Sequence, residues 1–575
     1  MAMSPPVGWV WAPDARSVDI ELHGAHHPMA AGDDGWWCPP RALRPGEDYR
    51  FVVDGGAPRP DPRSGWQPEG VDGPSRVDDP GAHRWQDEGW GGIHLPSAVI
   101  YEVHIGTFTP AGTFTAAIER LDHLVELGVS AVELMPVVEF PGGHGWGYDG
   151  VDLYAPHHRY GGPDGLRALI DACHRRGLAV ILDVVYNHLG PLGNHLAEFG
   201  PYFTDRYDTP WGAALNVDGA GSDEVRRFVI DNACRWVEEF HVDGLRLDAT
   251  HAIVDNSPVH VVEELAAEVG HTARLAGRHV AVIAEDDRND PRLLLPPTQG
   301  GRGLDGVWND DVHHAIHVAL TGEGDSYYGD FSGVPDLARA LRNGFVYDGR
   351  RSPNRGKRVG RPLGSIGHDR LVACIQNHDQ IGNRAQGDRL AAIAGTAAQR
   401  VGAGLLLTAP FVPLVFQGEE WAASTPFPYF CDHPDAELAR AVREGRRREF
   451  AAFGWAPDEV PDPGDPATVA SARLRWDERQ REPHAAMLAW YRELLALRSA
   501  TPELRDARIE PLVTHGADWI VAERGRVAVA ATTRDRGARV AIGDRSAVLA
   551  ATGDVELDGA GTATLGPRSF AVLGG

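Results

Sequence analysis

Eight short apolar runs alternate with amphipathic stretches between about Ser97 and Ser499, and this alternation limits the possible folds more than any other feature. The pattern is typical of parallel β/α units, in which a helix connects each strand to the next. The amphipathic stretches include 114–127, 165–176 and 224–240, and a long helix is expected over 484–499. The eight predicted strands, of which the sixth has the weakest pattern, are 98–105, 131–136, 179–185, 244–249, 280–285, 306–310, 371–378 and 411–418. Eight such units predict a closed (β/α)8 barrel.

The segments before and after the predicted barrel have a different composition and a different apolar pattern. Residues up to about Ile93 are rich in Pro, Gly, Asp and Trp, and short alternating stretches at 18–22 and 49–53 predict a small β-sandwich. Alternating stretches return after about Thr501, at 519–522 and 527–532. We therefore expect a multidomain α/β protein with an N-terminal β-sandwich (1–93), a catalytic barrel (94–500) and a C-terminal β-sandwich (501–575).

Composition excludes several classes of function. The formal net charge of −26 disfavours nucleic-acid and anionic-membrane partners, because phosphates would be repelled, whereas a neutral sugar is compatible with it. Five scattered cysteines without Cys-x-x-Cys spacing indicate reduced thiols. No signal peptide is visible at the start of the sequence, and no apolar run reaches transmembrane length. We expect a cytoplasmic protein.

Polar residues follow nearly every predicted strand of the barrel. Because the carboxyl ends of the strands meet at one mouth of a barrel, where catalytic residues of barrel enzymes lie, these residues are expected to converge. Those at the ends of strands three to seven are Asp183 and His188; Arg246, Asp248 and His251; Glu285; Asn309, Asp310 and His313; and His378, Asp379, Gln380 and Asn383.

Two of these acids are predicted to have opposite environments. Arg246 and Asp248 are two residues apart on a strand, so their side chains share one face, and a guanidinium keeps a neighbouring carboxylate ionised. Glu285 ends an apolar run, where desolvation would raise its pKa toward about 6, as a general acid needs. Such a pair provides the nucleophile and the acid/base of a glycosidase. Trp146 and Tyr148, in a Gly-rich loop after strand two, have rings suited to stacking on sugars.

Each residue also has a structural explanation when taken alone. An acid at a strand end is most often a loop residue or a helix N-cap, Arg246 and Asp248 could form a structural ion pair, and the two rings could simply pack the loop. Five strand ends that combine acids with His or Asn are harder to explain structurally, and together they favour an active site.

Four of these segments, 183–188, 243–251, 283–286 and 376–383, resemble in order the signature regions of the α-amylase superfamily of glycoside hydrolases. The resemblance covers about 97–499. It implies that Asp248 is the nucleophile, Glu285 the proton donor and Asp379 the acid that stabilises the transition state. It also implies that Arg246, His188 and His378 hold the sugar at the cleavage site.

Within the superfamily, segments 135–142, 283–291, 377–383 and 417–427 resemble the maltooligosyltrehalose trehalohydrolases, although Cys431 stands where a Thr is expected. This resemblance implies hydrolysis of the α-1,4 bond beside the terminal trehalose of maltooligosyl trehalose, a substrate made by a partner synthase. It also implies substrate contacts from the segment 309–313. The chemistry needs no metal and no other cofactor.

Two alternatives stay open. A glucan branching or debranching enzyme would share the three acids and the N-terminal module, although a branching enzyme is expected to have Glu where this chain has Gln380. A non-catalytic binding subunit would be expected to lack at least one of the three acids.

Overall fold

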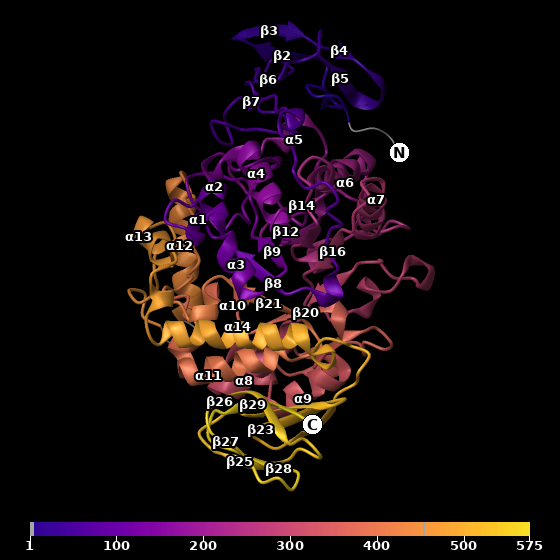
Figure 1. Cartoon of the computed structure of the whole chain (residues 1–575). Helices are drawn as coiled ribbons and strands as arrows, with labels where there is room; N and C mark the ends of the chain where they lie inside the picture. Colours follow the sequence, from indigo (N-terminus) through magenta and orange to yellow (C-terminus); the bar gives the residue numbers. More distant parts are fainter. Residues whose placement is uncertain (1–4, 452–454) are drawn as a thin grey trace.

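The computed structural model describes residues 5–451 and 455–575. Its centre is a closed barrel of eight parallel strands in the order β12-β15-β16-β17-β20-β21-β8-β9, with β-rich segments at its two ends (Figure 1). The barrel strands are β8 (Ile100–Val103), β9 (Ala131–Leu134), β12 (Ala179–Val184), β15 (Gly244–Leu247), β16 (Ala281–Ala284), β17 (Gly306–Trp308), β20 (Leu371–Cys374) and β21 (Val412–Phe416). The predicted fold class and all eight predicted strands are confirmed.

Several strands stop before the polar residues that ended their predicted ranges. β16 ends at Ala284, one residue before Glu285, and β15 ends at Leu247, one residue before Asp248. Asp248 and Glu285 therefore lie on the carboxyl-terminal rim of the barrel, just beyond the paired strands. β17 spans three residues, the fewest of the eight, in agreement with the weak pattern of the predicted sixth strand.

Helices surround the barrel (Figure 1). The stretch expected as one helix over 114–127 forms two, α2 (Phe114–Ile118) and α3 (Leu121–Leu127), because the Arg120 N–H bonds the Ala117 carbonyl at 2.9 Å and tightens the turn. The other main helices are α4 (Gly162–His174), α6 (Ser222–Glu238), α7 (Val261–Leu275), α8 (Asp310–Thr321), α9 (Val334–Asn343), α11 (Leu390–Leu407), α12 (Ala436–Ala451), α13 (Pro466–Ala472) and α14 (His484–Ala500).

Antiparallel sheets precede and follow the barrel. The N-terminal strands form one sheet of β1 (Val10–Trp11), β5 (Trp36–Cys38) and β4 (Ala30–Ala31), and another of β3 (Ala25–Pro28), β2 (Val18–Leu22), β6 (Asp48–Val53) and β7 (Ser75–Arg76). The C-terminal sheets contain β22 (Leu512–His515), β23 (Trp519–Arg524), β24 (Val527–Thr532), β29 (Phe570–Gly574) and β26 (Ala547–Thr552), and β25 (Ala538–Ala541), β28 (Thr562–Leu565) and β27 (Val555–Leu557).

Helix α11 corrects one expectation. It is long and apolar enough to cross a membrane, and it is the one helix of the described residues that passes this test. However, 56% of it is buried, and it contacts α8 and α14 as well as β24 and β29 of the C-terminal sheet. Its apolar character is explained by this position between the barrel and the sheet.

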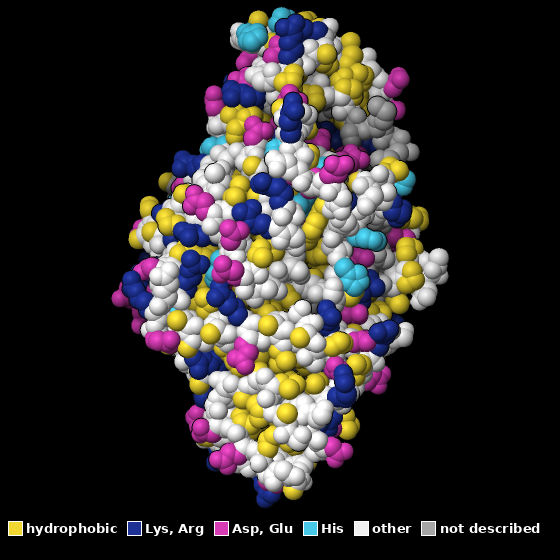
Figure 2. Space-filling view, viewed as in Figure 1, with side chains coloured by type: hydrophobic (Ala, Val, Ile, Leu, Met, Phe, Trp, Pro, Cys, Tyr) yellow, Lys and Arg dark blue, Asp and Glu magenta, His cyan; other side chains and the backbone are white. Residues whose placement is uncertain are grey.

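Charged side chains of both signs are interspersed over the face shown in Figure 2. The net charge of −26 is thus not gathered into one acidic field on that face. All five cysteines are unpaired, and Cys38 is the only one of them that is not buried.

Candidate active site

One guanidinium joins three carboxyl groups at the mouth of the barrel. Arg246, on β15, is fully buried, and its Nη1 lies 2.8 Å from Asp183 Oδ2 and 2.8 Å from Asp248 Oδ1. Its Nη2 lies 3.3 Å from Glu285 Oε2. The Arg246 guanidinium also lies over the Trp308 ring, with its Cζ 4.3 Å from the ring centroid. A buried cation with this many acidic neighbours fixes the positions of all of them.

Asp248 is held on both of its oxygens. Oδ1 accepts from Arg246, and Oδ2 accepts from Asn187 Nδ2 at 2.6 Å. The next residue, Ala249, has a left-handed backbone (φ 40°), and its N–H donates to Glu285 Oε2 at 2.6 Å. This turn after β15 thus connects Asp248 and Glu285, although β15 and β16 supply them separately.

Glu285 is in the environment expected of a general acid. Burial raises the pKa of Glu285 well above its ordinary value, and the charges of Asp248 and Asp379 raise it further, while Arg246 opposes the shift. The carboxyl therefore keeps its proton at a pH where a solvent-exposed glutamate has lost it.

Asp379 lies in the first turn of α10 (His378–Gly382), where Asn377 caps the helix by accepting from the Gln380 N–H at 2.8 Å. Asp379 Oδ2 is 3.6 Å from His378 Nε2, and its side chain is 36% exposed. Asn383 Nδ2 donates to Asp379 Oδ1 at 3.4 Å. The cap and the helix turn together bring the third acid of the predicted set to the same mouth as Arg246.

Tyr148 connects two sides of this mouth. Its hydroxyl donates to Asp183 Oδ2 at 2.6 Å and lies 2.7 Å from His378 Nε2. Trp146, in contrast, is 5% exposed and stacks on Phe427 with ring centroids 5.4 Å apart. The structure favours the packing alternative for Trp146 over a sugar contact.

His188 and His251 lie beside an aromatic ring that sequence reasoning missed. Trp211 is 47% exposed and stacks on His188 with ring centroids 5.4 Å apart; its ring is 6.4 Å from that of His251. It lies between β13 (Phe203–Thr209) and β14 (Gly212–Leu215). In the sequence, the Trp in the turn Pro210-Trp211-Gly212 was the one signal that could have pointed to this ring.

In the segment 309–313, some side chains are buried and cannot reach a substrate. Asn309 is buried and donates to the Gly344 carbonyl at 2.8 Å, and His313 is buried against the rings of His314, His317 and Tyr328. Packing accounts for both positions. Asp310 is half-buried, and burial, followed by the charges of Asp379 and Asp311, raises its pKa to about 7. Of this segment, Asp310 is therefore the residue best placed to face a substrate beside Asp379.

Two buried acids inside the barrel were also missed. Glu102 on β8 and Glu133 on β9 are directly paired in the strand register, and both are 1% exposed. An acid in the middle of an apolar strand was the signal in each case.

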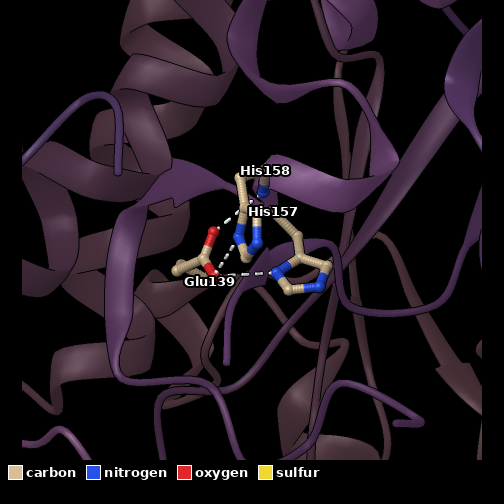
Figure 3. Close-up of side chains that lie close together, drawn as sticks. All are labelled: Glu139, His157 and His158. Carbon is tan, nitrogen blue, oxygen red and sulfur yellow. Dashed lines mark hydrogen bonds and ion pairs between the residues drawn. The ribbon is translucent and has the colours of Figure 1, made fainter. Parts of the chain in front are cut away.

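One group among the described residues has the donor set of a metal site: Glu139, His157 and His158, called here the Glu139 cluster (Figure 3). The Nδ1 atoms of His157 and His158 lie 2.9 and 2.8 Å from the same Glu139 Oε1, and the His158 N–H donates to Oε2 at 2.8 Å. Both imidazole Nδ1 atoms are already engaged with Glu139, so a metal at this position would have to displace their protons.

Comparisons with known proteins agree with this geometry. Residues 77–199 match the α-amylase catalytic-domain family. The chain is 48% identical to the malto-oligosyltrehalose trehalohydrolase of Arthrobacter ramosus over 98% of both chains. It is also 48% identical to that of Mycobacterium tuberculosis (strain CDC 1551 / Oshkosh), over 91% of each.

A solved structure is similar over nearly the whole molecule. The crystal structure of a putative alpha amylase from Salmonella typhimurium has a TM-score of 0.89 and 41% identity, and the match covers 99% of this chain and 97% of that one. Identity at this level over full-length relatives shows the family. The chain belongs to the malto-oligosyltrehalose trehalohydrolase family, whose members are glycosidases of the α-amylase type.

Proposed function

We propose that this enzyme hydrolyses the α-1,4-glucosidic bond next to the terminal trehalose of maltooligosyl trehalose, with Asp248 as nucleophile and Glu285 as acid/base. The observation that carries the proposal is the single Arg246 guanidinium, which contacts both carboxyls while burial raises the pKa of Glu285. One acid is placed to attack and the other to protonate.

The reaction takes place in two steps with retained configuration. Asp248 Oδ attacks the anomeric carbon as Glu285 gives its proton to the glycosidic oxygen, so that trehalose leaves and a covalent glycosyl-enzyme forms. Glu285, now a carboxylate, takes a proton from water, which attacks the same carbon and releases the malto-oligosaccharide with Asp248 restored. For this mechanism we expect the two carboxyls to be about 5–5.5 Å apart.

Asp379 acts through differential binding. A carboxylate that accepts hydrogen bonds from ring hydroxyls holds the oxocarbenium-like transition state more tightly than the ground state. Asp183 contacts Arg246 and Tyr148 in the structure, so we assign it to positioning these groups. His188, His251, Gln380 and Asn383 are proposed to bind substrate around the site. No step requires a metal.

The substrate chemistry implies a supplier. A maltooligosyl trehalose arises when the reducing end of a malto-oligosaccharide is rearranged to a trehalose unit, so we propose that a synthase with this activity acts before the enzyme. We place both in the cytoplasm, in agreement with the five unpaired cysteines.

Product analysis tests the proposal. The enzyme is incubated with maltotriosyl trehalose and the products are separated by chromatography, with Asp248→Ala and the surface variant Asp477→Ala compared. Asp477 is 63% exposed, and within residues 5–451 and 455–575 its carboxylate pairs only with Arg481, at 2.8 Å, so its removal controls for loss of an aspartate. We expect trehalose and maltotriose from the wild type and Asp477→Ala, and neither from Asp248→Ala. Altered iodine staining of amylose with no trehalose would favour the branching alternative.

A further inference from the structure

His378 has a buried partner on the opposite side from the substrate site. Both residues of the pair, Glu102 on β8 and His378 on α10, are 1% exposed. Glu102 Oε2 accepts from the His378 backbone N–H at 3.1 Å, and Glu102 Oε1 contacts His378 Nδ1. One carboxylate thus fixes both the ring and the backbone of a residue 276 positions away in the chain.

The hydrogen bonds around His378 determine where its protons lie. Both oxygens of Asp183 accept from Arg246 Nη1, at 2.9 and 2.8 Å, so Asp183 is a carboxylate. The Tyr148 hydroxyl has one proton and donates it to Asp183 Oδ2. At 2.7 Å from His378 Nε2, the same hydroxyl can only accept, which places a proton on Nε2.

The other ring nitrogen is also protonated. His378 Nδ1 faces Glu102 Oε1, and a carboxylate only accepts hydrogen bonds, so Nδ1 must donate. Protons on both nitrogens make the ring a positively charged imidazolium, which the negative Glu102 stabilises in this buried position.

We infer that Glu102 is a positioning residue for the proposed reaction, which holds His378 as a doubly protonated imidazolium beside Asp379. The positive ring, 3.6 Å from Asp379 Oδ2, holds that carboxylate oriented for the transition state. The inference rests on the proposed function in one respect, the role of Asp379.

The charges around His378 agree with this assignment. Burial lowers the pKa of His378, but the negative charges of Asp379 and Glu102 outweigh burial and raise it to about 9. Arg246 opposes the shift, and His104 has its own pKa lowered, first by burial, to about 4. Among the described residues, the titratable and charged groups around the ring are Glu102, His104, Glu133, Tyr148, Asp183, Arg246 and Asp379.

Glu133 provides a matched control. It is paired with Glu102 in the strand register and is equally buried, but burial, and then the charges of Glu102 and Asp183, raise its pKa well above the ordinary value. Its two oxygens have no hydrogen-bond partner among the described residues. Glu133→Gln therefore removes no charge, whereas Glu102→Gln removes the charge that holds His378 protonated.

The first test is the pH dependence of kcat and KM for the wild type, Glu102→Gln, Glu102→Asp and Glu133→Gln. In Glu102→Gln we expect the alkaline limb of kcat to move about 1–3 pH units lower and kcat at pH 8 to fall on the order of tenfold to a hundredfold, with a smaller change in KM. Glu102→Asp, which keeps the charge, restores the limb, and Glu133→Gln leaves it in place. If the alkaline limb of kcat in Glu102→Gln lies at the same pH as in the wild type, the inference is overturned.

A second measurement needs neither activity nor a folded variant of Glu102. The His378 ring resonances of the wild-type enzyme are followed by 15N NMR from pH 6 to 10 and assigned by their loss in His378→Gln. We expect both ring nitrogens to remain protonated until about pH 9. Loss of a proton below pH 7 overturns the inference. Because no substrate is added, this outcome is independent of whether trehalose is the product.

Discussion

At the scale of single residues, the site depends on the carboxyls of Asp248 and Glu285, which share Arg246. Glu285 accepts from the Ala249 N–H and lies close to Asp248 through the turn after β15. Because burial, together with the Asp248 and Asp379 charges, raises the pKa of Glu285, its acid form is fully present at low pH and is lost as the pH rises through that raised pKa. Loss of this proton, like loss of the His378 ring proton, should lower activity on the alkaline side, and a shift of the limb in Glu102→Gln reports on His378.

Glu285→Gln tests this role. With maltotriosyl trehalose we expect kcat/KM to fall on the order of 10²–10⁴-fold, because the leaving oxygen is no longer protonated. An acidic phenol leaves an aryl α-glycoside without needing a proton. The rate of phenol release in the first step should therefore fall much less in Glu285→Gln than kcat/KM with maltotriosyl trehalose does. Rapid-quench kinetics of phenol release separates that step from the second. An equal loss on both substrates would contradict the assignment of Glu285 as the acid.

At the scale of elements, the loop that carries Tyr148 is anchored at its base. β10 (Val138–Glu139) pairs with β11 (Asp152–Pro156), and the Glu139 cluster joins the first of these strands to the residues after the second. Burial opposes the charge of Glu139, but hydrogen bonds from His157 and His158 outweigh it and lower the pKa of Glu139. The cluster thus fixes the loop that reaches His378.

Glu139→Gln should loosen this anchor. We expect the free energy of unfolding at pH 7 to fall by about 2–4 kcal/mol, because two imidazole donors lose their buried carboxylate. The lowered pKa of Glu139 stabilises the folded protein at pH values above 4.5, the ordinary pKa of a glutamate. This stabilisation is lost as the pH falls through the pKa that Glu139 has in the folded protein. The variant lacks it at every pH, so it should lose less stability in acid than the wild type. Denaturant titrations at pH 7 and pH 4 measure both effects.

The same variant distinguishes hydrogen bonding from metal binding. If the Glu139 cluster is held by hydrogen bonds alone, the Tm of the wild type should be the same with EDTA, with Zn²⁺ and with neither. A Tm increase with Zn²⁺ that disappears in Glu139→Gln would show that a metal takes the place of the two imidazole protons.

At the scale of the whole molecule, the C-terminal sheet is joined to the barrel through α11 and two buried arginines. Arg498 of α14 and Arg524 of β23 both donate to the Leu504 carbonyl, at 3.1 and 2.8 Å, and Arg524 also donates to the Thr408 carbonyl at 3.4 Å. In α11, a Cβ on Gly404 would lie 2.7 Å from ring atoms of Phe570 on β29. The sheet and the helix therefore approach as closely as a glycine permits.

Gly404→Ala measures this contact. We expect a loss of about 1–3 kcal/mol in the free energy of unfolding, because the ring or the sheet must move away from the added methyl group. Gly445→Ala in α12 is the control, since a Cβ there meets nothing within 4 Å. Higher helix propensity should make that variant neutral or more stable. Thermal unfolding of both variants gives the comparison, and equal Tm values would show that the contact is not tight.

The local pattern of the sequence determined the barrel and the approximate location of its acids. Apolar runs and amphipathic stretches are short-range signals, and the eight strands they predicted appear in the structure with ends displaced by a few residues. Since all parallel strands of a barrel point to one mouth, an acid at a strand end is placed at that mouth before any contact is known. Asp248, Glu285 and Asp379 were found in this way.

Only the tertiary structure decided which groups face each other. The pairing of Glu102 with His378, the burial of Trp146 and the position of Trp211 over His188 depend on strand register and on how loops from distant parts of the chain fold over the mouth. A strand pattern predicts that a side chain points inward, but not what it meets there, because the partner belongs to another strand or loop, which for Glu102 and His378 is 276 residues away. Closure of the barrel supplies that information.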